Sequence, residues 1–387
     1  MDSNEIKWPK VNLGSLCNIF TGKKDVNQSV TQGKYVFFSC SPKEFYSDDY
    51  LYNGDAIIVA GNGSYTGKVR FFSGKFDLYQ RTYACVLKPL STNVSISFLY
   101  YVMKNQFEPR YLGGTRGSSI PYIVMGDLAN FEFLLPPLGV QRKIAGVLSA
   151  LDDKIELNNK INQNLKLQAQ ALFKSWFVDF EPFGSTIPAD WKVGNLLSIA
   201  DYLNGLAMQN FRPLENEKGL PVLKIKELRQ GFSDDSSELC SESIKSDYII
   251  NDGDVIFSWS GSLLVDFWCG GKCGLNQHLF KVTSKEFDKW FYYSWTRHHL
   301  DHFIAVAADK ATTMGHIKRN ELEKAKVFIP STSDYTKIGG IISPIYDMII
   351  QNRIENNHLS ELRDTLLPKL MSGEINVDKV DISDPIK

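Results

Sequence analysis

Apolar residues recur at spacings of three and four over two long segments, residues 140–177 and 335–370. The first stripe is Ile144, Leu148, Leu151, Ile155, Leu165, Leu172 and Trp176. The second is Ile338, Ile342, Ile345, Ile349, Leu359, Leu366 and Leu370. Such spacing places each stripe on one helix face. Helices of about 40 residues far exceed the usual 11–12 of globular proteins. We therefore predict two long helices that pair, with separate packing on two domains as the alternative.

Asn158 and Asn352 occupy equivalent places on the two stripes. A polar asparagine on an apolar seam costs stability but fixes the register of paired helices. We predict that these two residues set the pairing register.

The segments that precede the two helices are copies of each other. The segment "NLGSLCNIFTGK" (12–23) returns as "NLLSIADYLNGL" (195–206), with Gly22 on Gly205. Further aligned pairs are Gly54-Asp55 with Gly253-Asp254, "LYQRTY" (78–83) with "LNQHLF" (275–280), and "SSIPYIVMGDLANFEFLLP" (118–136) with "TTMGHIKRNELEKAKVFIP" (312–330). The segments 78–83 and 275–280 share a glutamine, Gln80 in the first and Gln277 in the second. The whole chain is therefore a tandem repeat.

Within each copy, short apolar strands alternate with short helical stretches, which predicts a mixed α+β module. Tandem copies can be related by a pseudo-two-fold axis if the long helices run antiparallel. The expected organisation is a first module at 1–138, a helix and linker at 139–184, a second module at 185–334, a helix at 335–375 and a tail at 376–387. The shared glycines Gly22, Gly54, Gly205 and Gly253 are expected to serve turn geometry.

Charge and composition narrow the classes of function. The formal net charge is −1, with 14 Lys+Arg against 11 Asp+Glu in residues 1–138 and 17 against 20 in residues 185–334. A nucleic-acid binder usually carries a basic excess, so any such affinity must come from local patches or a basic partner. No apolar run reaches the roughly 18 residues needed to cross a bilayer, and no signal segment opens the chain, which favours the cytoplasm. The six cysteines are expected to be reduced thiols.

Catalytic and metal-binding motifs are missing. The glycine-rich stretch "GNGSYTGKV" (61–69) fails the phosphate-loop spacing, because five residues separate Gly61 from Gly67 and Val69 follows Lys68. His298 and His302 lie one helical turn apart in "RHHLDHF" (297–303), which is more typical of a polar helix face than of a metal site. The sequence indicates a binding protein without catalysis or metal of its own.

Three segments resemble a known family. The stretch "PPLGVQRKIAGVLSALDDKIELNNKINQNLKLQAQALFKSWFVDFEP" (136–182) is similar to the central helical region of the specificity subunits of type I restriction–modification systems. The segments "IPADWKVGNL" (187–196) and "LRDTLLPKLMSGEI" (362–375) resemble the entry to their second recognition domain and their closing segment. One departure is visible: the second helix has Tyr335-Thr336 where the first has Gln141-Arg142, and it lacks an aromatic tail.

The resemblance implies a DNA sequence-specificity subunit with two target recognition domains, each reading one half of a split, asymmetric duplex site. It also implies that the helices set the spacer and dock two modification subunits, which bind S-adenosylmethionine and methylate adenine N6. Restriction subunits that use ATP and Mg²⁺ would complete the complex. The alternatives are a stand-alone or orphan DNA-binding adaptor and a coiled-coil scaffold that binds proteins.

Polar loop residues at matching points of the repeat are the candidates for DNA contact, because amides and bidentate donors read base edges. In the first module they are Asn62, Tyr65, Lys68, Arg81, Arg116 and Ser118. In the second they are Ser260, His278, Lys310, Thr312, Thr313, His316 and Lys318. Candidates for partner binding are Gln141, Arg142, Phe173, Trp176 and Phe177, although the aromatic residues can equally close the helix onto the next domain.

Overall fold

The computed structural model describes residues 8–112, 121–309 and 317–377. They form two compact units. Unit 1 consists of the described residues within 1–153 and 361–387, and unit 2 of those within 154–360. Each unit holds one module together with parts of both long helices, because the division falls within the helices.

Unit 1 is built on a six-stranded sheet with strand order β2-β7-β5-β6-β3-β4 and a separate β1-β8 pair. Its strands are β1 (Lys10–Asn12), β2 (Cys17–Thr21), β3 (Tyr35–Phe38), β4 (Phe45–Ser47), β5 (Tyr52–Ala60), β6 (Val69–Leu78), β7 (Thr82–Leu87) and β8 (Glu132–Leu134). Its short helices are α1 (Leu13–Leu16), α2 (Ile96–Val102), α3 (Glu108–Tyr111) and α4 (Met125–Ala129), with a π-helical turn at Met103–Phe107. One face of the sheet packs on these helices around Ile57, Val59 and Phe98.

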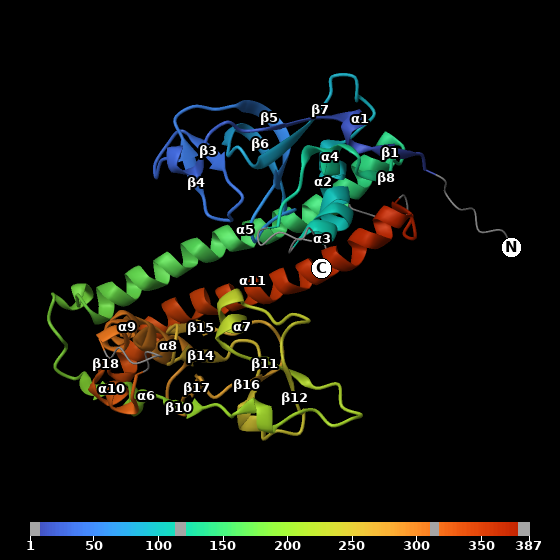
Figure 1. Ribbon diagram of the computed structural model, residues 1–387. Helices are drawn as coiled ribbons and strands as arrows, with labels where there is room; N and C mark the ends of the chain where they lie inside the picture. Colours follow the sequence, from blue (N-terminus) through green and yellow to red (C-terminus); the bar gives the residue numbers. More distant parts are fainter. Residues whose placement is uncertain (1–7, 113–120, 310–316, 378–387) are drawn as a thin grey trace. The chain divides into compact units, whose positions relative to one another are not determined.

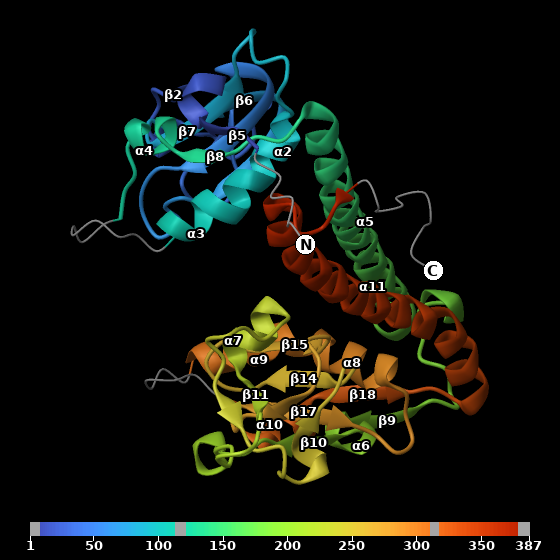
Figure 2. The same ribbon diagram turned by 90° about the vertical axis from the view of Figure 1, so that its right-hand side faces the viewer.

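Unit 2 repeats the central part of this sheet as β10-β17-β14-β15 and the small pair as β9-β18 (Figure 2). A further sheet has the order β12-β11-β16-β13. The strands are β9 (Lys192–Asn195), β10 (Asp201–Asn204), β11 (Leu220–Leu223), β12 (Leu239–Cys240), β13 (Ile249–Ile250), β14 (Val255–Ser258), β15 (Leu264–Phe267), β16 (Cys273–Leu275), β17 (Leu279–Thr283) and β18 (Lys326–Ile329). The short helices are α6 (Leu196–Ile199), α7 (Ile225–Gln230), α8 (Lys289–His298), α9 (Leu300–Asp309) and α10 (Arg319–Lys324).

The two modules thus share the order of four central strands and the small strand pair, as the sequence repeat predicts. The likeness extends to single hydrogen bonds. Asn12 caps α1 by accepting from Ser15 N at 2.8 Å, and Asn195 caps α6 by accepting from Ser198 N at 3.0 Å. Asparagine is a preferred residue at such positions because its side chain satisfies an amide that the helix leaves unpaired. The repeated sequence therefore encodes repeated local structure.

The two long helices are α5 (Leu138–Phe177), of 40 residues, and α11 (Thr332–Ser372), of 41 residues (Figure 1). In unit 1, Ile144 and Leu148 of α5 share a core with Leu367 and Leu370 of α11. In unit 2, Phe173 and Phe177 of α5 share a core with Ile338 and Ile342 of α11. In both units the beginning of one helix meets the end of the other, so the predicted antiparallel pairing is confirmed.

Asparagines join the helices within unit 2. Asn158 Nδ2 donates to Asn356 Oδ1 at 2.9 Å, and Asn352 Nδ2 donates to Asn162 Oδ1 at 2.9 Å. A sequence offset of 194 relates Asn158 to Asn352 and Asn162 to Asn356, so the two pairs occupy equivalent positions of the repeat. Asn158 is 1% exposed and Asn162 is 6% exposed. Asn158 and Asn352 therefore do pair across the seam, but each with a partner one turn further along rather than with each other.

The asparagine pairs give a first prediction, tested by a double-mutant cycle of Asn158→Ala and Asn356→Ala. Each substitution removes one hydrogen bond of the amide that remains, while Asn158 keeps its bond to Glu355 and Asn356 its bond to Asn159. Each should therefore lower the free energy of unfolding by about 1 kcal/mol. The double variant should lose less than the sum of the two, with the free energies measured by urea unfolding. Asn164→Ala, at an exposed position of the same helix, is the control and should change little. Additive effects would show that the two amides do not interact.

Candidate nucleic-acid interface

Three loops meet at one end of the sheet in unit 1. The chain leaves β5 at Gly61, whose amide donates to Arg81 O at 2.9 Å, and Ile123 N donates to Gly61 O at 2.9 Å. A tight turn between β6 and β7 is closed by a bond from Thr82 N to Tyr79 O at 2.9 Å. A pocket of about 260 Å³ lies here, lined by Gly61, Gln80, Arg81, Tyr83 and Ile123. The loops are thus tied by backbone bonds, while side chains such as Arg81 remain exposed.

Unit 2 ties the equivalent loops in the same way. Ile317 N donates to Trp259 O at 3.2 Å, as Ile123 does to Gly61. Between β16 and β17, Leu279 N donates to Asn276 O at 3.0 Å and closes the same kind of turn. Since backbone bonds do not depend on side-chain identity, the two clusters can differ in their polar side chains without losing their shape.

Glycine is required where these turns touch the first strand of each sheet. A Cβ added to Gly22 would lie 1.7 Å from Leu78 O, and one added to Gly205 would lie 2.2 Å from Asn276 O. The other shared glycines need their conformation, with φ of +139° at Gly54 and +81° at Gly253. All four have the backbone role that the sequence predicts, although Gly54 lies within β5 rather than in a turn.

The structure describes four of the six candidates for DNA contact in the first module. Tyr65 and Arg81 are exposed, and Asn62 forms a bridge to Tyr122 beside them. These three residues gather around the loop cluster. Arg116 and Ser118 lie outside the described residues.

Lys68 forms an ion pair within the module. Its Nζ lies 2.9 Å from Oε1 of Glu108, whose side chain is 9% exposed, and Lys104 Nζ lies 3.2 Å from the same oxygen. The second carboxylate oxygen accepts from Val69 N at 2.9 Å. A carboxylate withdrawn from water needs such partners. The Lys68 side chain is 36% exposed, and its contact with DNA stays a prediction.

The environment of Glu108 also sets its titration. Burial raises the pKa of Glu108, but hydrogen bonds from Lys68 and Val69 and the charge of Lys104 outweigh it, so the pKa lies below its ordinary value. Burial lowers the pKa of Lys104, partly opposed by the charge of Glu108. The Glu108 carboxylate is therefore ionised at neutral pH.

In the second module, Lys318 is exposed before α10, and His278 lies in the turn between β16 and β17. The His278 ring lies 6.3 Å from the Trp259 ring, and within the described residues its Nδ1 is buried without a hydrogen-bond partner. Ser260 is only 5% exposed, so it is a turn residue and not an accessible reader. Lys310, Thr312, Thr313 and His316 lie outside the described residues.

Helix α7 is an element that the sequence repeat does not reveal. In unit 1 the turn residue Tyr79 donates its N–H to Phe38 O at the end of β3, and in unit 2 the matching residue Asn276 donates to Leu223 O at the end of β11. The residues that follow β3 and β11 therefore occupy equivalent places in the two modules. Unit 1 continues there with the loop from Ser39, whereas unit 2 continues with α7. A Cβ on Gly261 would lie 3.6 Å from Ile225 Cδ1, which puts the start of α7 beside the loop after β14.

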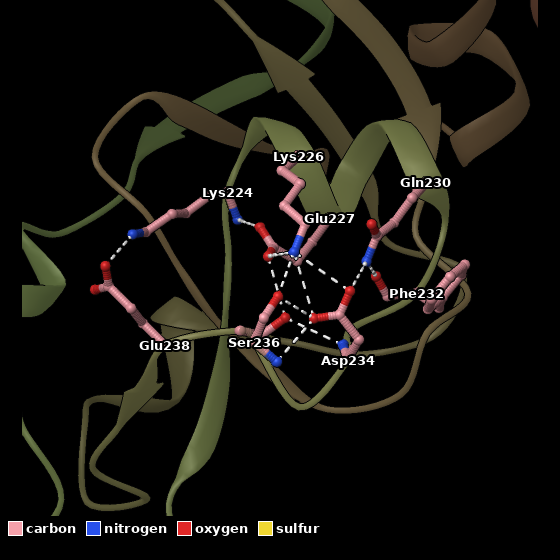
Figure 3. A network of polar contacts seen from close by, with 9 residues as sticks. Lys224, Lys226, Glu227, Gln230, Phe232, Asp234, Ser236 and Glu238 are labelled. Carbon is pink, nitrogen blue, oxygen red and sulfur yellow. Dashed lines mark hydrogen bonds and ion pairs between the residues drawn. The ribbon is translucent and has the colours of Figure 1, made fainter. Parts of the chain in front are cut away.

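A network of polar contacts holds α7 (Figure 3). Lys224 Nζ lies 2.6 Å from a Glu238 oxygen, and Lys226 Nζ lies 3.3 Å from Asp234. Hydrogen bonds from Ser236, together with contacts from Lys226, lower the pKa of Asp234 to about 2. Two lysines of the module thus pair with acidic residues of the same network. The repeat could not predict it, because the first module has, among its described residues, no helix at the equivalent place.

The candidates for partner binding are mostly internal. Gln141 is fully buried, where its amide donates to Pro136 O at 2.7 Å and to Asn93 O at 3.0 Å and accepts from Ser95 N at 2.8 Å. Phe173 and Phe177 lie in the core of unit 2 with ring centroids 5.0 Å apart, and Trp176 is half-buried against that core. Burial of Gln141, Phe173 and Phe177 supports the alternative that they close the helix onto the modules, whereas partner binding by half-buried Trp176 stays a prediction. Arg142 is exposed and stays a candidate.

In the described ranges, no group of three or more His, Cys, Asp or Glu residues could hold a metal ion, and His298 instead packs on Trp295 at 5.5 Å. All six cysteines are free thiols. No helix among the described residues is both long enough and apolar enough to span a bilayer.

Comparisons with known proteins agree on one family. The family described as "Type I restriction modification DNA specificity domain" matches residues 5–167 and again 188–361. The chain is 30% identical over 385 residues to the type I restriction enzyme MjaIX specificity subunit of Methanocaldococcus jannaschii, covering 88% of this chain and 87% of that protein. It is 22% identical over 409 residues to the HindI specificity subunit of Haemophilus influenzae, covering 86% and 88%. The crystal structure of the type I restriction–modification S subunit from M. genitalium shares the fold, with a TM-score of 0.65 at 19% identity, covering 95% of this chain and 97% of that one.

The Glu108 cluster gives a second prediction. Because the folded pKa of Glu108 lies below the ordinary value of 4.5, its stabilising effect is present above that pH and is lost as the pH falls through the folded pKa. Glu108→Gln should therefore lower the free energy of unfolding by about 1–2 kcal/mol at pH 7, and the difference should shrink below pH 4.5. Urea unfolding between pH 3 and pH 8 measures both.

Glu132→Gln is the matched control, since Glu132 pairs with Lys10 on the surface and its side chain is 55% exposed. Surface pairs contribute about 0–1 kcal/mol, so this variant should behave as the wild type at every pH. A constant difference for Glu108→Gln down to pH 3 would contradict the proposed ionic role.

Proposed function

The chain belongs to the family of type I restriction–modification DNA specificity subunits, and on this premise we propose that each of its modules reads one half of a split duplex site. The observation that supports this is the duplicated loop cluster: two sets of loops with the same backbone bonds carry different polar side chains. Where the first presents Arg81, the second presents His278. Two clusters of one shape and different chemistry suit two DNA segments of different sequence.

The helix pair is proposed to act as the spacer between the readers. A helix of 40 residues measures about 60 Å at 1.5 Å per residue. Equivalent major-groove faces recur about every 34 Å along the duplex. Helices of this length can therefore hold two readers one to two turns of DNA apart.

The remaining parts of the proposal concern the assembly. The helices would dock two modification subunits, which bind S-adenosylmethionine and methylate adenine N6, and restriction subunits would bring ATP and Mg²⁺. The chain itself would be non-catalytic and would act in the cytoplasm. Its net charge of −1 fits this division of labour, because partner subunits can neutralise much of the phosphate charge.

A rival proposal is a protein-binding scaffold, favoured by the acidic excess of residues 185–334, with 17 Lys+Arg against 20 Asp+Glu. Under this alternative the modules would bind proteins and the chain would have no effect on DNA methylation. An orphan DNA-binding adaptor would also leave methylation unchanged but would still bind duplex DNA.

The experiment that tests the proposed function is long-read mapping of modified bases in the host, with the gene intact and deleted. We expect a split N6-methyladenine motif that disappears on deletion and returns when the intact gene is supplied on a plasmid. An unchanged methylation pattern would contradict the guide function. Duplex-binding assays would then separate the orphan adaptor, which binds, from the scaffold, which does not.

A further inference from the structure

A groove runs along α5 in unit 2. Its two cavities, of about 290 Å³ and about 360 Å³, share Gln170, Arg297 and Tyr346 in their walls, so they are continuous. Gln170 comes from α5, Arg297 from α8 and Tyr346 from α11. Three helices thus meet around a space that the second module leaves open. Pockets of this kind receive the anchor side chains of a protein partner.

The first module fills the equivalent corner with an arginine. Tyr101 Oη donates to Asp152 Oδ2 at 2.7 Å, and Arg363 Nη1 donates to Asp152 Oδ1 at 2.7 Å. Asp152 lies on α5 and Arg363 on α11, so the guanidinium bridges the two long helices beside the module.

The second module has other residues at these positions. The offset of 194 that relates the asparagines also relates Asp152 to Tyr346 and Ala169 to Arg363. Tyr346 packs on Tyr293 with ring centroids 5.1 Å apart, just as Asp152 meets a tyrosine in the first module. A methyl group therefore stands where unit 1 has a guanidinium, and the groove remains beside Tyr346.

The groove presents two cations that have no internal partner. Lys166 and Arg297 are exposed, and among the described residues neither has a hydrogen bond or an ion pair. The carboxylate of Asp266 in the same wall is bonded to Arg353 at 2.9 Å. Lys166 lines the smaller cavity, whereas Asp301 lines only the larger one. The smaller cavity therefore has an excess of positive charge, which favours a carboxylate from a partner.

The larger cavity adds apolar surface. Phe173 and Val178 line it, Val178 is 39% exposed, and Leu167 on α5 is 64% exposed. The cation in this part, Lys174, is paired with Asp179. Phosphate groups call for cations and hydrogen-bond donors, whereas protein interfaces combine arginine and tyrosine with apolar neighbours. The groove therefore suits a protein segment better than a DNA backbone.

We propose that this groove docks one modification subunit, through a segment that places a carboxylate between Lys166 and Arg297 and apolar side chains along Phe173 and Val178. This inference rests on the proposed function, in which two modification subunits bind the chain. Since Arg363 occupies the equivalent corner of the first module, the two subunits are held by different contacts and with different affinities.

The test uses the complete chain and the host's modification subunit, each purified, and counts the complexes by native mass spectrometry as the modification subunit is added. The variant combines Lys166→Ala and Arg297→Ala. Because both side chains are exposed and lack internal partners, the variant should fold, which circular dichroism and thermal unfolding verify. Lys160→Ala is the matched control, because Lys160 is an exposed cation of the same helix that pairs with Glu156 and lines neither cavity.

We expect the wild type and the control to bind two modification subunits. The double variant should bind one subunit with unchanged affinity and the other about 10- to 100-fold more weakly, since truncated arginine anchors are among the most costly losses at interfaces. Added salt should weaken this step in the wild type more than in the variant. Asp301→Asn, which removes a carboxylate from the same groove, should bind the subunit at least as tightly as the wild type.

Four results would overturn the inference. The double variant could bind both subunits as the wild type does, or it could lose both equally. Asp301→Asn could weaken the step that the double variant leaves unchanged, which would reverse the charge of the docked segment. Weaker binding of a duplex with the mapped motif, with both subunits bound normally, would assign the two cations to DNA phosphates.

Failure of the proposed function has a different signature. A wild type that binds no modification subunit would overturn the proposed assembly and this inference together. Two subunits bound by the wild type and by the double variant alike would overturn this inference alone.

Discussion

The antiparallel pairing of the two long helices is the constraint on which the rest of the structure depends. Asparagine amides bond across it, Asn158 with Asn356 and Asn352 with Asn162. An apolar seam alone would tolerate sliding by a turn, but a shift would leave these amides unpaired in a dry interior. Since each module packs on parts of both helices, the register also determines which residues each module meets.

A second constraint is that backbone atoms, and not the exposed side chains, determine the shape of the loop clusters. The loop clusters owe their form to backbone hydrogen bonds and to glycines where strands approach closely, such as Gly22 and Gly205. Side chains at the exposed positions are then free to differ between the modules. This arrangement suits a specificity subunit, because the bases read can change while the scaffold and its attachment to the helices stay the same.

Features that repeat locally could be predicted from the sequence. The module repeat, the long helices and the turn glycines follow from periodicity and from backbone geometry, which neighbouring residues largely determine. The sequence predicts that asparagines lie on the seam between the helices. Which asparagines bond to each other follows only from the three-dimensional structure.

Features that depend on tertiary contacts were missed. Lys68 reads as a loop cation, but its partner Glu108 is 40 residues away and is buried. Gln141 reads as a surface residue near the start of a helix, yet it satisfies three backbone groups inside unit 1. The α7 network has no counterpart in the first module, so the repeat could not reveal it.

The most direct test of this account is the spacer length of the methylated motif after a paired insertion. Seven helix-forming residues would be added between Asn158 and Asn162 in α5, and seven between Asn352 and Asn356 in α11, so that both asparagine pairs are kept. The helices lengthen by about 10 Å, which corresponds to about three base pairs. We expect unchanged half-sites and a spacer longer by about that number, whereas insertion in α5 alone should abolish methylation. An unchanged spacer with the paired insertion would contradict the central claim that the helix pair holds the two readers apart.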